Sequence, residues 1–306
     1  MPEIARTPEL AASFVTCRAI ARQAGGSFAA GMRLCPGHRR DAMLVVYAWT
    51  RTADDLADEP GRDAETRRTD LAQFREHTLA ALAGDPDPAS IWPAVSSTAM
   101  RYDLDPRWCT DLLEGVESDV EPRQPETLAE LLEYCRRVAS TVGLMCVRIW
   151  GTVGSTPWAD VEQLAIRRGH ALQLTNIVRD LGDDMRETPA RTYMPAEVLR
   201  AVGITADELA AWSSPAPCAE AVGALTAEAA RAYEDSAPLA RLVDPACLPV
   251  LDAMSSVYAR YLDVLTRDPQ RAVLGPRVRL TKAQRAVIAG RAWVAARTGI
   301  AASVSP

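Results

Sequence analysis

The stretch of sequence that decides the fold runs from Gln173 to Asp184 and reads QLTNIVRDLGDD. Polar residues recur in it at intervals of three, four and four: Gln173, Asn176, Asp180 and Asp184. Residues at these intervals share one face of an α-helix. Leucine, isoleucine and valine crowd the other faces. A polar stripe that faces an apolar core without partners costs free energy. The stretch therefore predicts a buried helix with one polar face along a cavity.

The helix that carries this stripe is predicted to be the longest of the chain. Thr156 and Pro157 supply an N-cap and a first-turn proline, and the pattern continues to about Arg186, before Pro189. A helix of roughly 30 residues exceeds the usual globular length, which indicates a core helix that crosses a large domain.

The rest of the chain also follows helical periodicity, without convincing alternation of period two. Further helices are predicted at 39–58, 67–82, 127–150, 194–201, 205–213, 216–242, 245–266 and 281–298. The economical interpretation is a single all-α domain over residues 1–306, a helical bundle around a central cavity.

A second polar stripe lies on the predicted helix 39–58. Its members are spaced by four, three and four residues: Tyr47, Arg51, Asp54 and Asp58. Taken alone, such a stripe is typical of a solvated acidic face near the end of a helix. Together with the stripe on the long helix, it predicts two acidic faces that line one polar cavity inside an apolar bundle.

The residue types in the two stripes indicate the chemistry of that cavity. Carboxylate and amide oxygens are hard ligands that suit Mg²⁺ better than zinc, and Mg²⁺ is usually held by a few carboxylates plus substrate phosphates. A carboxylate cluster repels a diphosphate unless divalent ions lie between them. Arg51 and Arg179 lie on the same helices, where they can clamp phosphate oxygens. The pattern favours a metal-held diphosphate whose departure leaves a carbocation, shielded from water by the bundle.

The composition of the 306 residues excludes several other classes of protein. With 48% hydrophobic and 24% charged residues, the chain has the balance of a folded globular protein. A net charge of −6 disfavours nucleic acid as a partner. The seven cysteines form no CxxC pair, which argues against a disulfide framework and against a zinc site.

Targeting and nucleotide-binding motifs do not occur in the sequence. The N-terminal residues contain early acids and no long apolar core, and no window approaches the length of a membrane span, so we expect a cytoplasmic protein. Residues 283–297 predict a weakly amphipathic helix that caps the bundle, with peripheral contact to a membrane surface as the alternative. No GxGxxG or GxxxxGK[ST] string signals a Rossmann or P-loop site.

At its two stripes the sequence resembles the squalene/phytoene synthase family, the head-to-head trans-prenyl transferases. The resemblance rests first on Asp54-Asp-x-x-Asp58, preceded by Arg51, and on the string from Gln173 to Asp184. Further matches extend over most of the chain: Ser27-Phe28, Arg39-Arg40-Asp41, Tyr134-x-x-x-Val138, Arg191-x-Tyr193-x-Pro195 and Tyr258. Ser140 stands where the family usually has a glycine.

The resemblance implies an all-α prenyl-synthase fold with both acidic motifs at the mouth of a central cavity. It implies that Mg²⁺, with Mn²⁺ as a substitute, is held by Asp54, Asp58, Asn176, Asp180 and Asp184. It assigns contacts with diphosphate or with the reacting carbons to Tyr47, Arg51, Gln173 and Arg179. It assigns the two prenyl sites to Ser27, Phe28, Tyr134 and Val138, and Arg191, Tyr193 and Tyr258 complete the substrate-binding set. The expected catalytic residues are Tyr47, Arg51 and the four aspartates.

By the same resemblance, the substrates are two prenyl diphosphates, farnesyl or geranylgeranyl. One allylic diphosphate ionises, the C2–C3 alkene of the second attacks the cation, and a cyclopropyl diphosphate results. A second ionisation rearranges this intermediate to a squalene-type or phytoene-type product. Prenyl chain length, the extent of the second half-reaction, the use of NADPH and the oligomeric state stay open.

Two other functions also stay open on the sequence. The stretch Ala24-Gly25-Gly26 stands where many family members have a polar segment that contacts phosphate. This change is compatible with an enzyme that moves one prenyl group to an indole-type or carbazole-type ring. The third hypothesis is a non-catalytic helical protein whose acidic faces are solvated.

Overall fold

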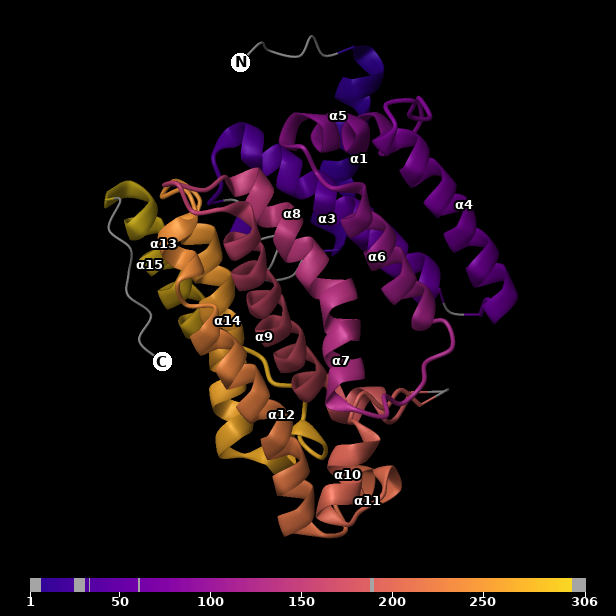
Figure 1. The fold of residues 1–306 in the computed structure, drawn as a ribbon, viewed down its shortest axis with the longest axis vertical. Coiled ribbons are helices and arrows are strands. Elements are labelled where there is room, and N and C mark those ends of the chain that lie inside the picture. Colours follow the sequence, from indigo (N-terminus) through magenta and orange to yellow (C-terminus); the bar gives the residue numbers. More distant parts are fainter. Residues whose placement is uncertain (1–6, 25–30, 33, 60, 188–189, 299–306) are drawn as a thin grey trace.

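The computed structural model describes residues 7–24, 31–32, 34–59, 61–187 and 190–298, which form helices and their connections (Figure 1). The helices are α1 (Pro8–Ala24), α3 (Gly37–Asp58), α4 (Ala64–Leu82), α5 (Trp92–Tyr102), α6 (Pro106–Ser118), α7 (Leu128–Cys135), the π-helical η1 (Arg136–Ser140), α8 (Thr141–Trp150), α9 (Trp158–Asp184), α10 (Ala196–Val202), α11 (Ala206–Ala211), α12 (Pro215–Asp235), α13 (Leu239–Leu242), α14 (Leu248–Arg267), the 3₁₀ turn η2 (Pro269–Ala272) and α15 (Lys282–Thr298). Within these ranges, strand-like pairing is limited to a bridge between Thr152 and Val243. The predicted all-α class is confirmed.

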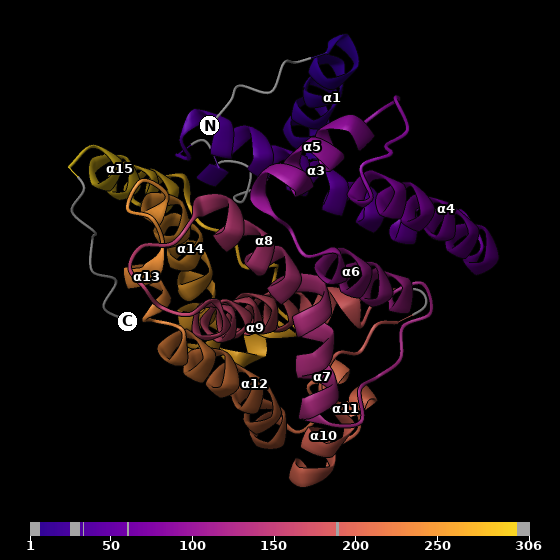
Figure 2. The ribbon, with the colours of Figure 1, turned by 45° about the horizontal axis from the view of Figure 1, so that its top comes forward.

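Helix α9 lies at the centre of the molecule. Figure 2 shows it almost end-on, surrounded by α7, α8, α12 and α14. It packs against α8, α12 and α14, and its residues Leu174, Val178 and Leu181 have no exposed surface. The prediction of a core helix that crosses the domain is therefore confirmed, because apolar residues on most of its faces each find a neighbouring helix.

Helix α3 is oriented by an aromatic anchor on its buried side. Trp49 is 2% exposed, and its indole N–H donates a 3.0 Å hydrogen bond to the hydroxyl of Thr78 on α4. The ring of Phe74 lies between Trp49 and Trp92, with centroid distances of 6.1 and 4.9 Å. Since Trp49 is held on the α4 and α5 side, the stripe that begins at Tyr47 faces the interior of the bundle.

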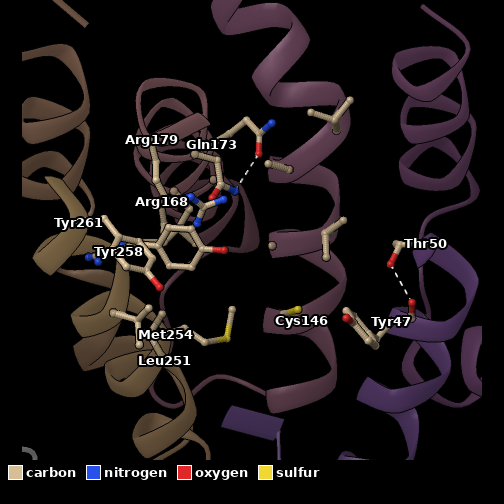
Figure 3. Close-up of a pocket in the computed structure, with 18 of the residues that line it drawn as sticks. Tyr47, Thr50, Cys146, Arg168, Gln173, Arg179, Leu251, Met254, Tyr258 and Tyr261 are labelled. Carbon is tan, nitrogen blue, oxygen red and sulfur yellow. Dashed lines mark hydrogen bonds between the residues drawn. The ribbon is translucent and has the colours of Figure 1, made fainter. Parts of the chain in front are cut away.

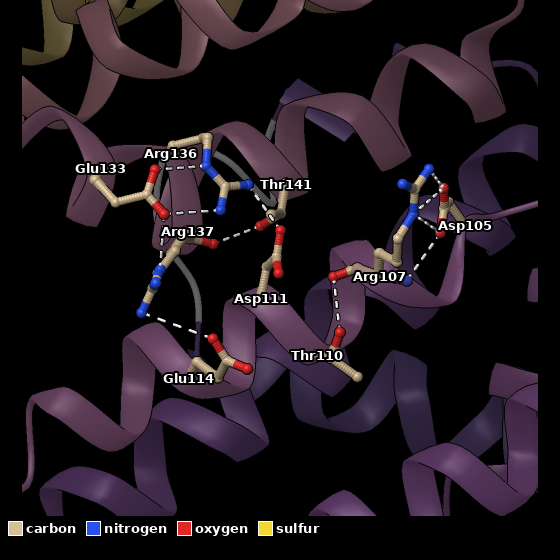
Figure 4. A network of polar contacts seen from close by, with 9 residues as sticks. All are labelled: Asp105, Arg107, Thr110, Asp111, Glu114, Glu133, Arg136, Arg137 and Thr141. Atoms are coloured by element: carbon tan, nitrogen blue, oxygen red, sulfur yellow. Dashed lines mark hydrogen bonds and ion pairs between the residues drawn. The ribbon is translucent and has the colours of Figure 1, made fainter.

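The predicted helix 127–150 is interrupted by a π-helical segment, so the prediction of a regular helix is wrong there. Ion pairs hold this segment, η1, against α6 (Figure 4). The Arg136 guanidinium pairs with Asp111 on α6 at 2.7 Å and with Glu133 at 2.8 Å, and Arg137 pairs with Glu133 at 2.9 Å and with Glu114 at 3.6 Å. A π segment turns the following side chains by a different angle from an α-helix. Its apolar residues Val138 and Ala139 line the cavity described below.

Two close helix contacts position α9. Ser140 is fully buried and donates a hydrogen bond of 2.9 Å to the carbonyl oxygen of Ile166. A Cβ atom at Gly169 would lie 2.5 Å from the Cα of Ser140, and one at Gly182 would lie 2.8 Å from the carbonyl carbon of Val273. Both sites require glycine because neighbouring backbone occupies the space of a side chain.

The structure also corrects the outlines of other predicted helices. The segment 216–242 is divided into α12 and α13, because Ser236 to Pro238 form a turn at a proline. Helices α1, α5 and α6 were not predicted individually. Helix α15, which includes the weakly amphipathic segment, packs against α14. Among the described residues, no helix has the length and apolar character needed to cross a membrane.

Candidate active site

A cavity of about 820 Å³ lies between α3, η1, α8, α9 and α14 and is closed on one side by the segment before α15. Both polar stripes contribute to its wall, with Tyr47, Arg51 and Asp54 on α3 and Gln173 and Asn176 on α9. Figure 3 shows α3 and α9 on different sides of the open space, with Tyr47 and Gln173 labelled. The prediction that the two stripes line one cavity is confirmed for these residues.

Much of the remaining cavity wall is apolar. The apolar residues come from α6, α8, α13, α14 and the segment before α15: Leu112, Val142, Cys146, Trp150, Leu239, Leu251, Met254 and Leu280. The predicted prenyl-site residue Val138 belongs to this wall, and Tyr258 and Tyr261 on α14 add aromatic rings to it. Such a wall can bury a hydrocarbon chain, while the polar stripes can bind a charged group.

The carboxyl group of Asp54 has an unusual environment. Asp54 is an exposed residue whose side chain lines the cavity. Desolvation by the protein around the cavity raises the pKa of Asp54 to about 7, against the opposing effect of the Arg51 guanidinium, and the nearby Asp58 raises it further. A raised pKa means that the ionised carboxylate is disfavoured relative to the neutral acid. A divalent cation bound beside it would stabilise the ionised form.

Asn176 carries an unpaired oxygen atom. Its side-chain N–H₂ donates to Gln173 Oε1 at 3.4 Å, which leaves Oδ1 buried without a hydrogen-bond partner among the described residues. An orphaned amide oxygen in a polar cavity costs free energy. It is also a suitable ligand for a hard cation.

The carboxylate of Asp180 lies between two guanidinium groups. Arg179 contacts it at 2.8 Å through Nε and 2.6 Å through Nη2. Arg277, in the segment before α15, contacts it at 2.6 and 2.7 Å through the corresponding atoms. Arg277 also lines the cavity. The sequence did not predict Arg277, because a single arginine in a loop belongs to no periodic pattern.

Arg191 connects the two acidic motifs. Its guanidinium pairs with Asp58 at 2.5 Å and with Glu187 at 3.3 Å, and its backbone N–H donates to the carbonyl oxygen of Asp184 at 2.9 Å. Burial raises the pKa of the Asp184 carboxyl group to about 7, with a further contribution from Asp180. Asp58, Asp180 and Asp184 are not among the residues that line the cavity. Asp180 is hydrogen-bonded to Arg179 and Arg277, which do line it.

Tyr134, which was predicted at a prenyl site, and Tyr193 do not line this cavity. Both lie in an adjacent polar pocket of about 590 Å³. Their hydroxyl groups donate to the same carboxylate, that of Asp119, at 3.0 and 2.9 Å. Burial raises the pKa of Asp119 to about 6, and the two hydroxyl groups oppose this rise. Asp119 was missed because it stands alone in the sequence and meets its partners only through the fold.

Two further predicted residues, Ser27 and Phe28, lie outside the described residues. Arg51 does line the cavity, and its guanidinium pairs with Asp55 on the same helix. Arg168 also lines the cavity and was not predicted, although it precedes the decisive stretch by only one turn of α9.

The donor atoms fit a cation that takes only part of its coordination shell from protein. Among the described residues, no three histidine, cysteine or acidic side chains converge on one point. The available donors are instead the orphaned oxygen of Asn176 and separate carboxylates, including Asp54 and Asp180. Mg²⁺ commonly takes one or two carboxylates and completes its shell with waters and substrate phosphates. The oxygen of Asn176 and the carboxylate of Asp54 are thus donor types that suit Mg²⁺ bound together with a diphosphate.

Comparison with known proteins identifies the family of the chain. The squalene/phytoene synthase family model matches residues 21–284. Presqualene diphosphate synthase from Rhodopseudomonas palustris is 34% identical over 256 residues, which cover 83% of this chain and 79% of the relative. Phytoene synthase from Mycobacterium tuberculosis is 30% identical over 294 residues, covering 95% and 93% of the two chains.

Solved structures show the same fold. A crystal structure of a dehydrosqualene synthase aligns with a TM-score of 0.78 at 24% identity, covering 94% of this chain and 98% of the other. A squalene synthase from Alicyclobacillus acidocaldarius aligns with a TM-score of 0.77 at 24% identity, covering 86% and 97%. From the family match and the relatives at 30% identity or more, we conclude that this chain belongs to the squalene/phytoene synthase family of prenyltransferases.

Proposed function

We propose that this protein is a Mg²⁺-dependent prenyltransferase that condenses two prenyl diphosphates, farnesyl or geranylgeranyl, head to head through a cyclopropyl diphosphate. The strongest support is that two polar stripes, on α3 and α9, line one cavity whose other walls are largely apolar. This arrangement matches a substrate with a doubly charged head and a hydrocarbon tail. The relatives named as presqualene diphosphate synthase and phytoene synthase support the same reaction type.

In this proposal the stripes bind and orient the diphosphate. The metal-binding residues are Asp54, Asp58, Asn176, Asp180 and Asp184. Bound Mg²⁺ neutralises charge that develops on the leaving diphosphate. Arg51, Arg179 and Arg277 line the same cavity, where guanidinium groups can bind phosphate oxygens. To bind phosphate, Arg277 must first release its two hydrogen bonds to Asp180.

The apolar wall protects the carbocation that remains after ionisation. Tyr47, Tyr258 and Tyr261 line the cavity, and the faces of aromatic rings attract cations. Their rings and the aliphatic wall exclude water, which would otherwise quench the cation to an alcohol. The same wall holds the alkene of the second substrate near the cationic carbon.

A direct product assay tests the proposal. The protein is incubated with Mg²⁺ and either farnesyl or geranylgeranyl diphosphate, and pyrophosphate and lipid products are measured. Release of pyrophosphate with a dimeric C30 or C40 product supports the proposal, and a dimeric diphosphate shows that the reaction stops at the cyclopropyl intermediate. Parallel assays with Mn²⁺ and with NADPH show whether the metal can be substituted and whether the product is reduced. Absence of any dimeric product contradicts the proposal.

One observation favours a second candidate function, transfer of a single prenyl group to an oxygen-bearing aromatic acceptor. Arg168 places a guanidinium in the cavity wall, about 18 Å along α9 from Asp180. Its Nη1 donates to the Ser255 hydroxyl at 3.0 Å, and it lies 5.2 Å from the centroid of the Tyr233 ring. Its Nε is buried without a hydrogen-bond partner among the described residues.

A hydrocarbon tail has no hydrogen-bond acceptor to offer, so the guanidinium of Arg168 would stay incompletely paired beside it. A carbonyl or hydroxyl oxygen on an indole-type or carbazole-type ring would supply one. The test compares such an acceptor with its oxygen-free analogue, using wild type and Arg168→Leu. This candidate function predicts that the wild type prenylates the oxygenated ring. In Arg168→Leu, the KM for that acceptor should rise about tenfold, with little change in kcat. If Arg168→Leu leaves KM unchanged or only lowers the melting temperature, Arg168 has a structural role alone.

A further inference from the structure

Two cysteine side chains from distant parts of the chain meet outside the active site. The Sγ atoms of Cys35 and Cys247 lie 3.5 Å apart, although the residues are separated by 212 positions. Cys35 lies two residues before α3, and Cys247 lies directly before α14. Both thiols are buried, with exposed fractions of 4% and 0%.

A fixed guanidinium distinguishes this pair from the other cysteines. Nη1 of Arg39 lies 3.5 Å from the Sγ of Cys247, and its Nη2 donates to Asp244 at 2.8 Å. Asp244 in turn donates its backbone N–H to the carbonyl oxygen of Gly151 at 2.9 Å. Arg39 is thereby held beside the sulfur by Asp244, whose own backbone is fixed to Gly151.

The two thiols have different protonation chemistry. The hydrogen bond with Cys35, and then the charge of Arg39, lowers the pKa of Cys247 against the effect of burial. The same hydrogen bond and burial raise the pKa of Cys35. Either sulfur can donate the hydrogen bond between them. Because the guanidinium of Arg39 lies 3.5 Å from the Sγ of Cys247, Cys247 is the sulfur whose thiolate is stabilised by a neighbouring positive charge. In contrast, burial raises the pKa of Cys17, Cys109 and Cys146 to about 12.

We propose that Cys35 and Cys247 are a dithiol–disulfide modification site that is oxidised by small peroxides. The Cys247 thiolate attacks one oxygen of hydrogen peroxide, the O–O bond breaks, and sulfenic acid and one water form after proton uptake. The Cys35 sulfur then attacks the sulfenic sulfur, and the second water leaves with the thiol proton. The sum is two thiols and one peroxide to one disulfide and two waters. Closure to the disulfide length of about 2.05 Å requires each sulfur to move less than 1 Å.

The disulfide would join the beginnings of two helices that form the active-site wall. Helix α3 carries the stripe from Tyr47 to Asp58, and α14 carries Tyr258. The bond would close a loop of more than 200 residues, which removes conformational freedom from the unfolded chain. Oxidation should therefore stabilise the native protein against heat.

The experiment oxidises the full chain with hydrogen peroxide and compares it with protein kept in dithiothreitol. The expected intact mass is lower by two hydrogen atoms, and peptide mapping should place the crosslink between Cys35 and Cys247. Thiol titration in denaturant should find five of the seven cysteines free. The melting temperature should rise by about 5 °C and return on reduction.

Matched variants distinguish a specific crosslink between Cys35 and Cys247 from oxidation of the other cysteines. Cys35→Ser and Cys247→Ser should both abolish the crosslink and the rise in melting temperature, while Cys109→Ser should retain them. Arg39→Gln should slow disulfide formation about tenfold, because the thiolate loses its neighbouring charge. If a serine variant does not fold, the peptide map of the oxidised wild type still shows whether Cys35 and Cys247 are crosslinked. Seven free thiols after treatment, a crosslink between other cysteines, or sulfinic acid at Cys247 without a crosslink would each overturn the proposal.

Discussion

The guanidinium of Arg277 holds the carboxylate of Asp180 through two hydrogen bonds of 2.6 and 2.7 Å, across 97 residues of chain. Asp180 is one of the proposed metal ligands. Arg179 binds the same two oxygens at 2.8 and 2.6 Å. A metal ion at Asp180 would therefore compete with these guanidinium groups for the lone pairs of the carboxylate.

We predict that Arg277→Gln binds Mg²⁺ more tightly in the absence of substrate. Loss of the competing guanidinium should lower the dissociation constant about threefold, which corresponds to the small free energy of a partly exposed ion pair. Isothermal titration calorimetry measures this change. Arg267→Gln is the control, since it removes the same charge from a pair with Asp263 at 2.7 Å. Equal affinity in wild type and Arg277→Gln would contradict the competition.

A second prediction compares two aspartates on α9. Asp180→Asn should reduce pyrophosphate release about 100-fold or more, because the amide is a weaker ligand and loses the negative charge. Asp183→Asn should retain most of the activity, since Asp183 is half exposed and pairs only locally with Arg186 at 2.9 Å. Circular dichroism should show native helical content in both. Comparable activity in the two variants would remove Asp180 from the proposed metal site.

A third prediction concerns the contact between α9 and η2. Gly182→Ala should lower the free energy of unfolding by about 3 kcal/mol, because the new Cβ would overlap the backbone of Val273. Gly223→Ala on α12 should raise it by about 0.5 kcal/mol, since the new Cβ meets no atom within 4 Å and alanine favours a helix. Urea unfolding measures both changes. If Gly182→Ala lowered the free energy of unfolding only slightly, α9 and the backbone at Val273 would be able to move apart at little energetic cost.

The buried imidazole of His170 predicts a pH dependence of stability. Burial, followed by the charge of Arg167, lowers the pKa of His170 to about 4. Neither ring nitrogen has a hydrogen-bond partner among the described residues. The unfolded chain binds this proton at higher pH than the native protein does, so stability is lost as pH falls from about 6.5 towards 4.

The expected loss attributable to His170 is about 2 kcal/mol between pH 8 and pH 5. Urea unfolding at both pH values gives the free energies. The variant His170→Leu should lose correspondingly less stability over this interval. His77→Leu is the control, because His77 is partly exposed and lies 3.7 Å from Asp87. An equal pH dependence in wild type and His170→Leu would assign the effect to other groups.

The helices with polar stripes were predictable because their patterns are local. The interval of three or four residues identified 39–58 and 156–186, and the structure has helices at Gly37–Asp58 and Trp158–Asp184. Side chains at this interval lie on one face whatever the helix packs against. For the same reason, Tyr47, Arg51 and Asp54 could be assigned to one wall before the fold was known.

The π-helical segment η1 was not predictable in this way. Its apolar residues continue a pattern that also fits an α-helix, and the ion pair between Arg136 and Asp111 that fastens it to α6 joins residues 25 positions apart. The hydroxyl groups of Tyr134 and Tyr193 likewise turn to Asp119 rather than to the cavity. These contacts depend on which helices become neighbours.

The sequence by itself determined the helical class, the two acidic stripes and the residue types that suit a metal-bound diphosphate. Each follows from periodicity and from the chemistry of single side chains. Only the tertiary structure decided that Arg277 reaches Asp180, that Arg168 enters the cavity wall and that Cys35 meets Cys247. These pairs carry no periodic signal, since their atoms meet only after helices distant in the chain pack against one another.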